Sequence, residues 1–316
     1  MTRRVLFVRD STPVSPAHYL HRALEDEGAD VYPIYIDRFR WSYQYGNRLP
    51  GLRSQWPDLY YQPSLGPLRR WGRFDLVLVS DWLRVPEKVL RLGKLSAFWA
   101  FDPELRPDSA FYDGRHRYRD LPPFDLIFNS QPTLGAWLKD DYPSSKVYTL
   151  PFAAPRHLYA GLHGARSRPS GFVGTLKAGK RLSFLRELER KVPGFYLPED
   201  RLFTPWEYAT EMSTLRASVN LSENHEVAIR AFEAVAAGCI LVQDQVADLE
   251  TLLGDELYRI GVVTFQEQDR APEAIRTAVG RSASDPTVHD RIRALALRDH
   301  SYHARAREIL RRSGLS

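Results

Sequence analysis

The sequence predicts an α/β protein built from two doubly wound, Rossmann-like domains. Its length of 316 residues accommodates two domains, because a domain takes about 150 residues. Continuous apolar runs recur along the chain, and such runs are typical of parallel strands covered on both faces. The first run is followed by a helical pattern and a second run, the order of a βαβ unit. We expect the ligand between the two domains, in a central cleft at the carboxyl ends of the strands.

The first predicted domain covers residues 1–155. It opens with a strand at 4–9, a helix at 17–27 with apolar positions at helical spacing, and a second strand at 31–36. Residues 38–73 are rich in Pro, Gly, Trp and Tyr and predict a long loop with short helical pieces. The later apolar runs predict strands at 76–79, 96–101, 126–128 and 147–150.

A predicted linker at 156–170, rich in Pro, Gly and His, precedes the second domain at 171–298, and residues 299–316 form a final helix. In the second domain, apolar runs predict strands at 171–174, 217–221 and 239–242. Helical patterns alternate with these runs at 181–191, 229–237 and 272–280. The second domain therefore repeats the alternation of the first.

Composition narrows the class of protein. A single Cys excludes a disulfide framework and a Cys-based zinc site. No apolar run approaches the roughly 20 residues of a membrane span, and the first residues lead directly into a strand without a signal core. We therefore expect a cytoplasmic protein. The formal net charge of +5 favours anionic ligands such as nucleotides, phosphates or nucleic acid without choosing among them.

The most specific stretch of the sequence is RAFEAVAAGCILV, residues 230–242. It places Glu233 near the start of a helix of small residues, which can lie close to its neighbours. Gly238 then allows a tight turn into a buried strand. The alternative interpretation is a well-packed helix–strand unit with a surface glutamate.

This motif resembles the donor-site signature of GT-B glycosyltransferases, most closely that of the CgeB-like (spore maturation protein) branch of the glycosyltransferase group 1 family. Three further stretches of the chain resemble elements of that branch. They are 98–103 (FWAFDP), 172–175 (FVGT) with Arg181, and 300–305 (HSYHAR). The resemblance covers most of the chain in the expected order. It implies a GT-B architecture whose last helix crosses back onto the N-terminal domain.

The resemblance also implies a metal-independent hexosyl- or pentosyltransferase. Such an enzyme moves a sugar from a nucleotide-diphosphate sugar, for example a UDP-sugar, to an acceptor hydroxyl, and needs no further cofactor. Glu233 would accept hydrogen bonds from the ribose hydroxyls, because an ionised carboxylate offers only acceptors. The other residues implied at the phosphates or the sugar are Gly174, Thr175, Lys177, Lys180, Arg181, His225 and Arg230.

The basic residues Lys177, Lys180 and Arg181 lie at a predicted helix start, where the helix dipole disfavours cations. A bound phosphate would remove this conflict, whereas the alternative is a solvated basic helix start. One position departs from the family pattern. Retaining enzymes of the sucrose-synthase-like family carry two glutamates with seven residues between them. Counted back from Glu233, the first position here is His225, with Glu226 one residue later. Retention or inversion at the sugar therefore stays open.

Two residues of the first domain are candidates for the catalytic base. His18 follows the loop after the first strand, where inverting GT-B enzymes often carry a histidine, and imidazole has a suitable pKa. Asp102 follows a strand and precedes Pro103. The alternatives are a polar first-turn residue for His18 and a turn aspartate for Asp102. Asp81, at the end of the preceding strand, is a weaker third candidate.

The acceptor stays open between a small molecule, a glycan and a modified nucleic-acid base. Helical spacing places the C-terminal arginines on one solvated face, and these are Arg291, Arg293, Arg298, Arg305, Arg307, Arg311 and Arg312. The net charge of +5 and the aromatic-rich loop from Arg38 to Trp71 permit a nucleic-acid partner without demanding one. Two other classes remain: a noncatalytic two-domain binding protein that keeps the architecture, and phosphorylase or epimerase chemistry on the same fold.

Overall fold

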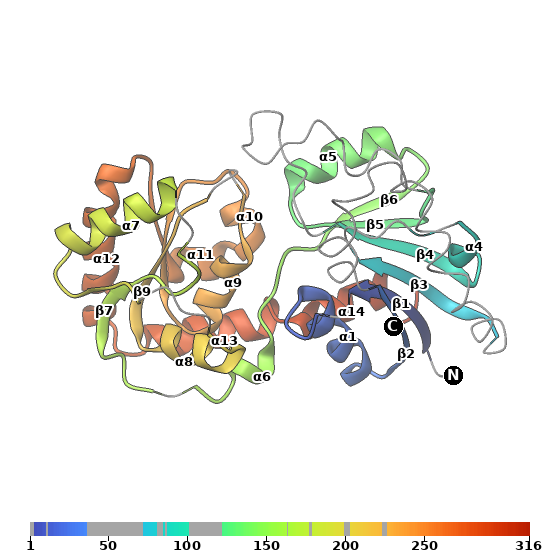
Figure 1. Ribbon diagram of the computed structural model, residues 1–316, viewed down its shortest axis with the longest axis horizontal. Coiled ribbons are helices and arrows are strands. Elements are labelled where there is room, and N and C mark those ends of the chain that lie inside the picture. Colours follow the sequence, from blue (N-terminus) through green and yellow to red (C-terminus); the bar gives the residue numbers. More distant parts are fainter. Residues whose placement is uncertain are drawn as a thin grey trace, which may run out of the picture. The chain divides into compact units, whose positions relative to one another are not determined.

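The structure, a computed structural model, divides the chain into two compact units. Unit 1 comprises Met1–Pro151 and Arg305–Ser316, and unit 2 comprises Phe152–Ala304. The residues described are 3–10, 12–36, 72–80, 85, 87–100, 122–162, 164–176, 179–198, 203–222 and 226–316. Each unit is a parallel sheet with helices (Figure 1), which confirms the predicted class of two α/β domains.

Unit 1 has a six-stranded parallel sheet in the order β2-β1-β3-β4-β5-β6. Its strands are β1 (Arg3–Asp10), β2 (Ala29–Ile36), β3 (Phe74–Ser80), β4 (Gly93–Ala100), β5 (Leu126–Asn129) and β6 (Lys146–Thr149). Its helices are α1 (Pro16–Asp26), α4 (Glu87–Leu90), α5 (Pro132–Asp141) and most of α14 (Tyr302–Arg312). The strand order reverses between β1 and β3. The carboxyl ends of these two strands therefore form the topological switch point of unit 1.

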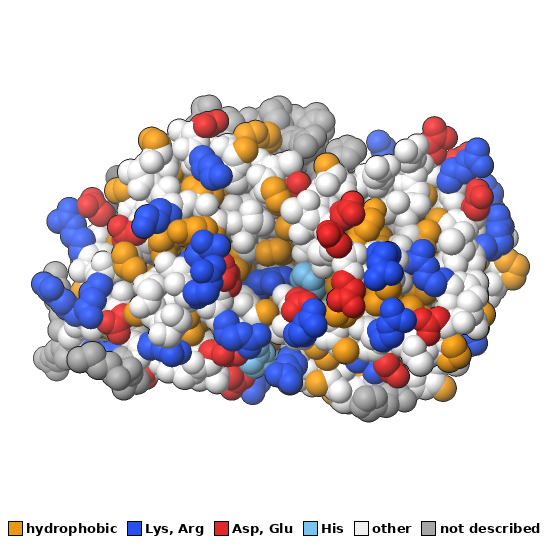
Figure 2. Space-filling model, turned by 180° about the vertical axis from the view of Figure 1, so that it is seen from behind, with side chains coloured by type: hydrophobic (Ala, Val, Ile, Leu, Met, Phe, Trp, Pro, Cys, Tyr) orange, Lys and Arg blue, Asp and Glu red, His pale blue; other side chains and the backbone are white. Residues whose placement is uncertain are grey.

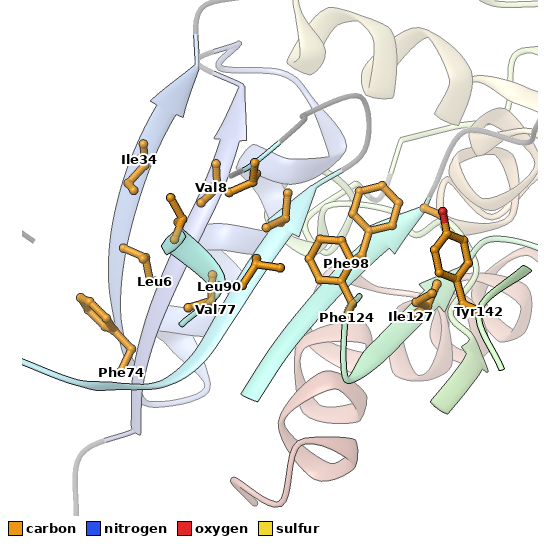
Figure 3. Packing of buried hydrophobic residues seen from close by; sticks show 14 of the residues in the cluster. Leu6, Val8, Ile34, Phe74, Val77, Leu90, Phe98, Phe124, Ile127 and Tyr142 are labelled. Carbon is orange, nitrogen blue, oxygen red and sulfur yellow. The ribbon is translucent and has the colours of Figure 1, made fainter. Parts of the chain in front are cut away.

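One face of this sheet carries a buried hydrophobic cluster (Figure 3). Leu6 and Val8 of β1 lie on it together, because alternate residues of a strand share a face. Phe98 of β4 packs on Phe124 with 5.2 Å between ring centroids. Burying this apolar surface on a rigid sheet fixes the positions of the strand ends at the switch point.

On the other face, the side of α1 and α14 in Figure 1, Phe7 of β1 contacts His21 of α1. Arg307 Nη1 of α14 lies 2.7 Å from Glu27 Oε1, immediately after α1. The Arg312 guanidinium lies 4.2 Å from the ring centroid of Tyr148. These contacts attach the last helix to the first domain of the chain.

Unit 2 has a five-stranded parallel sheet in the order β11-β10-β9-β7-β8. Its strands are β7 (Arg168–Gly171), β8 (Phe195–Tyr196), β9 (Leu215–Asn220), β10 (Ile240–Asp244) and β11 (Val262–Phe265). Its helices are α6 (Arg156–Tyr159), α7 (Lys180–Lys191), α8 (Pro205–Ser213), α9 (Ile229–Ala236), α10 (Leu249–Leu253), α11 (Asp255–Gly261), α12 (Ala271–Ser284) and α13 (Val288–Asp299). Here the order reverses between β7 and β9, so unit 2 has its switch point at their carboxyl ends.

The first strand of unit 2 lies three residues earlier than the predicted strand at 171–174. Arg168 and Ser170 pair with β9, although their polar character conceals the strand in the sequence. Residues 156–170, predicted as a linker, contain α6 and most of β7 and lie within unit 2. The chain divides between the units after Pro151.

The basic C-terminal stretch forms two helices, α13 and α14. Arg293 and Arg305 are each 7% exposed, so the prediction that they lie on the solvated face is wrong. Arg305 Nε donates to the Pro151 carbonyl at 2.8 Å, and Arg293 Nη2 lies 3.4 Å from the Ala237 carbonyl. These backbone acceptors satisfy guanidinium groups that the helical pattern alone places outside.

The remaining C-terminal arginines of the prediction are exposed or nearly so, and they pair with carboxylates. The pairs are Arg291 with Asp285, Arg298 with Asp299, Arg307 with Glu27, and Arg311 and Arg312 with Glu308. Figure 2 shows a similar mixture, with blue and red side chains interspersed over the face in view. This pairing does not favour a nucleic-acid surface on these helices. None of the described helices is long and apolar enough to cross a membrane.

Candidate functional site

The switch point of unit 2 brings together residues that follow β7 and β9. Gly174 lies shortly after β7, and Arg230 and Glu233 lie in α9, the helix that follows β9. A Cβ atom at Gly174, whose φ is +151°, would clash with the Arg230 guanidinium. That guanidinium also stacks 4.4 Å from the ring centroid of Phe172. Glycine at 174 therefore suits the backbone angle, which other residues rarely adopt, and leaves room for the Arg230 guanidinium in this position.

Glu233 is held from a second helix. The Tyr208 hydroxyl, on α8, donates to Glu233 Oε2 at 2.9 Å. Helix α8 starts with a capping box, in which the Glu207 backbone N–H donates to Thr204 Oγ1 and the Thr204 backbone N–H donates to Glu207 Oε2. This cap fixes the first turn of α8, and Tyr208 follows it directly.

The environment of Glu233 disfavours its charge. Burial raises the pKa of the Glu233 carboxyl, and the Tyr208 hydrogen bond and the Arg230 charge act in the opposite direction. Burial and the nearby Glu233 carboxylate raise the pKa of Tyr208. The phenol therefore stays protonated and acts as the donor.

Arg230 and Glu233 each keep hydrogen-bonding capacity that the described protein groups do not use. Arg230 Nε is buried without a hydrogen-bond partner, and no described carboxylate forms an ion pair with the guanidinium. Tyr208 is the one described hydrogen-bond partner of Glu233 and occupies Oε2. A guanidinium without a counter-ion and a carboxylate oxygen without a donor lie one helical turn apart. This pair is complementary to a ligand that carries both an anion and hydroxyl groups.

A second basic feature lies at the start of α7. No side chain caps this helix, and its first turn contains no acidic residue. Lys180 is exposed and Arg181 is partly buried, while Thr175 is exposed in the preceding loop. Unpaired N–H groups at a helix start bind anions, and an anion there also relieves the conflict between the helix dipole and the two cations. Lys177 and His225, also predicted at this site, lie outside the described residues.

A buried polar pair at the ends of β9 and β10 was not predicted from the sequence. Asn220 ends β9, and its Nδ2 donates to Gln243 Oε1 of β10 at 3.0 Å. Both side chains are fully buried, yet Asn220 Oδ1 and Gln243 Nε2 have no hydrogen-bond partner among the described residues. Polar residues at the ends of two otherwise apolar runs were the signal that could have revealed them.

The switch point of unit 1 has a different arrangement, centred on Arg9 of β1. Its side chain is 3% exposed. Nε donates to His21 Nδ1 at 3.1 Å, Nη1 donates to the Asp10 carbonyl at 2.9 Å, and Nη2 lies 3.4 Å from His18 Nδ1. The guanidinium stacks 4.8 Å from the ring centroid of Tyr35. No described carboxylate forms an ion pair with it.

These contacts determine the imidazole tautomers. A guanidinium has no acceptor, so the Nδ1 atoms of His18 and His21 have to accept, and the ring proton lies on Nε2. Burial, and then the charge of Arg9, keep the pKa of His21 below its ordinary value, although Glu25 opposes this shift. In this tautomer His18 presents a donor, whereas a general base requires a lone pair.

The other predicted residues of unit 1 have simpler positions. Asp10 Oδ1 accepts from the Thr12 backbone N–H at 2.8 Å and orders the turn after β1. Asp102 and Asp81 lie outside the described residues. Within the described part of the chain, no group of three or more His, Cys, Asp or Glu side chains could hold a metal ion.

Comparisons with known proteins concern the family and the fold of the chain. A family model described as "Glycosyl transferase-like" matches residues 182–311, which include Arg230 and Glu233. No curated protein matches the sequence. The family match is broader than the CgeB-like branch, which stays a prediction.

Solved structures with the same fold are GT-B glycosyltransferases. Sucrose-phosphate synthase from Thermosynechococcus elongatus has a TM-score of 0.64 and 13% identity, with 98% of each chain covered. WaaG, a glycosyltransferase involved in lipopolysaccharide biosynthesis, has a TM-score of 0.62 and 12% identity over 97% of this chain and 98% of its own. HepE from Anabaena, in complex with UDP, has a TM-score of 0.60 and 13% identity over 98% and 99%. The chain therefore has the GT-B fold.

Proposed function

We propose that the protein is a glycosyltransferase that moves a sugar from a nucleoside-diphosphate sugar to an acceptor hydroxyl. The family match and the fold support this chemistry, and HepE binds UDP and UDP-glucose. The observation that carries the proposal is the pairing of Arg230, which has no described counter-ion, with Glu233, which has an oxygen left for a ligand. A nucleoside diphosphate supplies both complements, a phosphate for the guanidinium and ribose hydroxyls for the carboxylate.

In the proposed reaction, the bond between the anomeric carbon and the diphosphate oxygen breaks, and the nucleoside diphosphate leaves with the electron pair. The anomeric carbon bonds to the acceptor oxygen, whose proton passes to a base. Arg230, Lys180 and Arg181 offset the negative charge that grows on the leaving diphosphate, which stabilises the transition state. This role needs no metal ion.

We assign the base to Asp102 in preference to His18. Arg9 lies at His18 Nδ1 and leaves Nε2 protonated, so His18 would donate a hydrogen bond to the acceptor. In the sequence, Asp102 comes two residues after the end of β4 at Ala100. A hexose or pentose as the transferred sugar, and a small molecule, glycan or nucleic-acid base as the acceptor, remain within the proposal.

Calorimetry with a panel of UDP-, GDP- and dTDP-sugars tests the proposal, together with an assay for nucleoside diphosphate release. We expect one donor to bind, Glu233→Ala to weaken its binding about tenfold or more, and Arg181→Ala chiefly to slow turnover. If the wild-type protein binds no member of the panel, the assignment is wrong. Binding without release in the presence of acceptor candidates would instead support the noncatalytic alternative.

A further inference from the structure

Tyr208 belongs to none of the motifs that carry the family resemblance, yet it forms the one described hydrogen bond to Glu233. The two residues come from different helices, α8 and α9, which contact each other. The hydroxyl approaches Oε2 at 2.9 Å and leaves Oε1 without a described partner. Glu233 is only partly buried, so a ligand can reach the carboxylate.

A single directional donor has a large effect on such a carboxylate. The terminal torsion of a glutamate is broad, so an unrestrained carboxylate samples many orientations. A phenol fixed by its own helix restricts that torsion and selects which oxygen faces outward. Arg230 acts on Glu233 through its charge and also lies next to Tyr208. The Tyr208 hydroxyl is the described group that donates a directional hydrogen bond to the carboxylate, so it is the group that selects which oxygen faces outward.

We propose that Tyr208 orients the Glu233 carboxylate toward the vicinal hydroxyls of a ribose and so makes unit 2 selective for ribonucleoside over 2′-deoxyribonucleoside diphosphates. This inference rests on the proposed function. Tyr208 is a positioning residue, because it acts through Glu233 and does not itself touch the reacting atoms. A site that hydrogen-bonds a hydroxyl discriminates strongly against the analogue that lacks it, because its buried polar group is then left unpaired.

The alternative is a purely structural role, in which the hydrogen bond only attaches α8 to α9. The two roles differ in what Tyr208→Phe changes. A structural link would weaken the binding of every nucleotide equally. An orienting role would affect the ribose hydroxyl selectively, and it would also move the pH dependence of binding.

The experiment measures calorimetric binding of UDP and 2′-deoxy-UDP to the wild type, to Tyr208→Phe and to Tyr196→Phe. If another nucleoside diphosphate binds best, that ligand and its 2′-deoxy form are used. The control is matched, because the Tyr196 hydroxyl also donates to a carboxylate of unit 2, Glu211 Oε2 at 3.1 Å, outside the site. Thermal melting verifies that each variant is folded.

We expect the wild type to prefer UDP about tenfold or more, as for a hydrogen bond to a charged group. Tyr208→Phe should weaken UDP binding about tenfold, weaken 2′-deoxy-UDP binding about twofold, and so remove most of the preference. In Tyr208→Phe, the loss of UDP binding on acidification should also begin at a higher pH. The reason is that the Tyr208 hydrogen bond lowers the pKa of Glu233, and the variant lacks this bond. Tyr196→Phe should match the wild type in its affinity for UDP, its affinity for 2′-deoxy-UDP and the pH dependence of UDP binding.

An equal loss for both ligands, an unchanged preference, or tighter wild-type binding of the deoxy form would each overturn the inference and leave the proposed function standing. No binding of any nucleoside diphosphate by the wild type would instead overturn the proposed function. If Tyr208→Phe is poorly folded, Glu233→Gln gives a second route. We expect that variant to lose the ribose preference while its amide oxygen still accepts from Tyr208, and a preference that survives would also contradict the inference.

Discussion

Each unit has an arginine at the point where its strand order reverses, and the two arginines have different surroundings. Arg9 in unit 1 is 3% exposed and bonded by two imidazoles and a carbonyl. Arg230 in unit 2 has a buried Nε without a partner and no described counter-ion. The same topology thus supports a guanidinium that is hydrogen-bonded within its own unit in one case, and a guanidinium whose buried Nε has no described partner in the other. The topology indicates where a ligand can bind, and the unused hydrogen-bonding capacity indicates which kinds of chemical group would complement the site.

This difference predicts whether a substitution in each unit mainly changes the free energy of unfolding or the affinity for a ligand. A group whose partners are all internal contributes mainly to the free energy of unfolding. A group that awaits a ligand contributes mainly to binding, and its removal leaves few protein contacts broken.

The largest expected effect is at Arg230. Arg230→Gln should weaken the binding of the nucleoside-diphosphate donor about 50-fold, since it removes a charged donor to phosphate. The free energy of unfolding should change by less than about 0.5 kcal/mol. Calorimetry and urea denaturation measure the two quantities, with Arg216→Gln, at an exposed arginine of β9, as the control. If Arg230→Gln lowered the free energy of unfolding and left donor affinity unchanged, Arg230 would have a structural role like that of Arg9.

The reciprocal substitution is Arg9→Gln. It leaves Nδ1 of His21 and the Asp10 carbonyl short of donors, so the unfolding free energy of unit 1 should fall by about 2 kcal/mol. Nucleoside diphosphate affinity in unit 2 should stay within about twofold of the wild type. Urea denaturation followed by tryptophan fluorescence detects the change. A stable Arg9→Gln protein would show that the network contributes nothing to the fold.

A smaller effect separates the two sites by pH. The pKa of Glu233 is raised above its ordinary value of 4.5, mainly by burial. Between 4.5 and the folded pKa the folded state binds more protons, so stability is lost as pH rises through this window. Glu233→Gln removes this cost and should be more stable at pH 8 by on the order of 1 kcal/mol. Denaturation series at several pH values should show the advantage shrinking toward pH 4.5.

His21 should change the pH dependence of stability in the opposite direction to Glu233. Its pKa lies below the ordinary value of 6.5, mainly through burial, so the folded state prefers the neutral ring. Stability should therefore fall as pH drops from 6.5 toward the folded pKa, and His21→Asn should flatten this slope. If Glu233→Gln and His21→Asn changed the pH dependence of the unfolding free energy in the same direction, the contrast between the two sites would be wrong.

The central pair of the proposed donor site could be predicted from the sequence because a single helix, α9, carries both residues. Arg230 and Glu233 belong to one continuous pattern of small residues. Tyr208 lies 25 residues before Glu233, on a helix that the apolar periodicity did not reveal. The capping-box pair Thr204 and Glu207 was the available signal for that helix.

Contacts that depend on tertiary packing could not be predicted in the same way. His18 suggested a base, but the buried Arg9 that sets its tautomer reaches it only when β1 and α1 are packed. Gly238 was predicted as a turn, and its φ of +80° agrees. Its second requirement, space for the Arg166 guanidinium and the His289 carbonyl, comes from segments distant in the sequence.

The position of α14 has a consequence for the order in which the protein can form during translation. Residues 152–304 make up unit 2, and its two ends meet where the Ala154 backbone N–H donates to the His300 carbonyl at 2.9 Å. A ribosome therefore synthesises all of unit 2 before Arg305–Ser316, the segment that packs on unit 1. Domains usually fold in the order of their synthesis. Here unit 1 can complete its packing only after its last segment has been made, so we expect unit 2 to be the first to reach its full native packing.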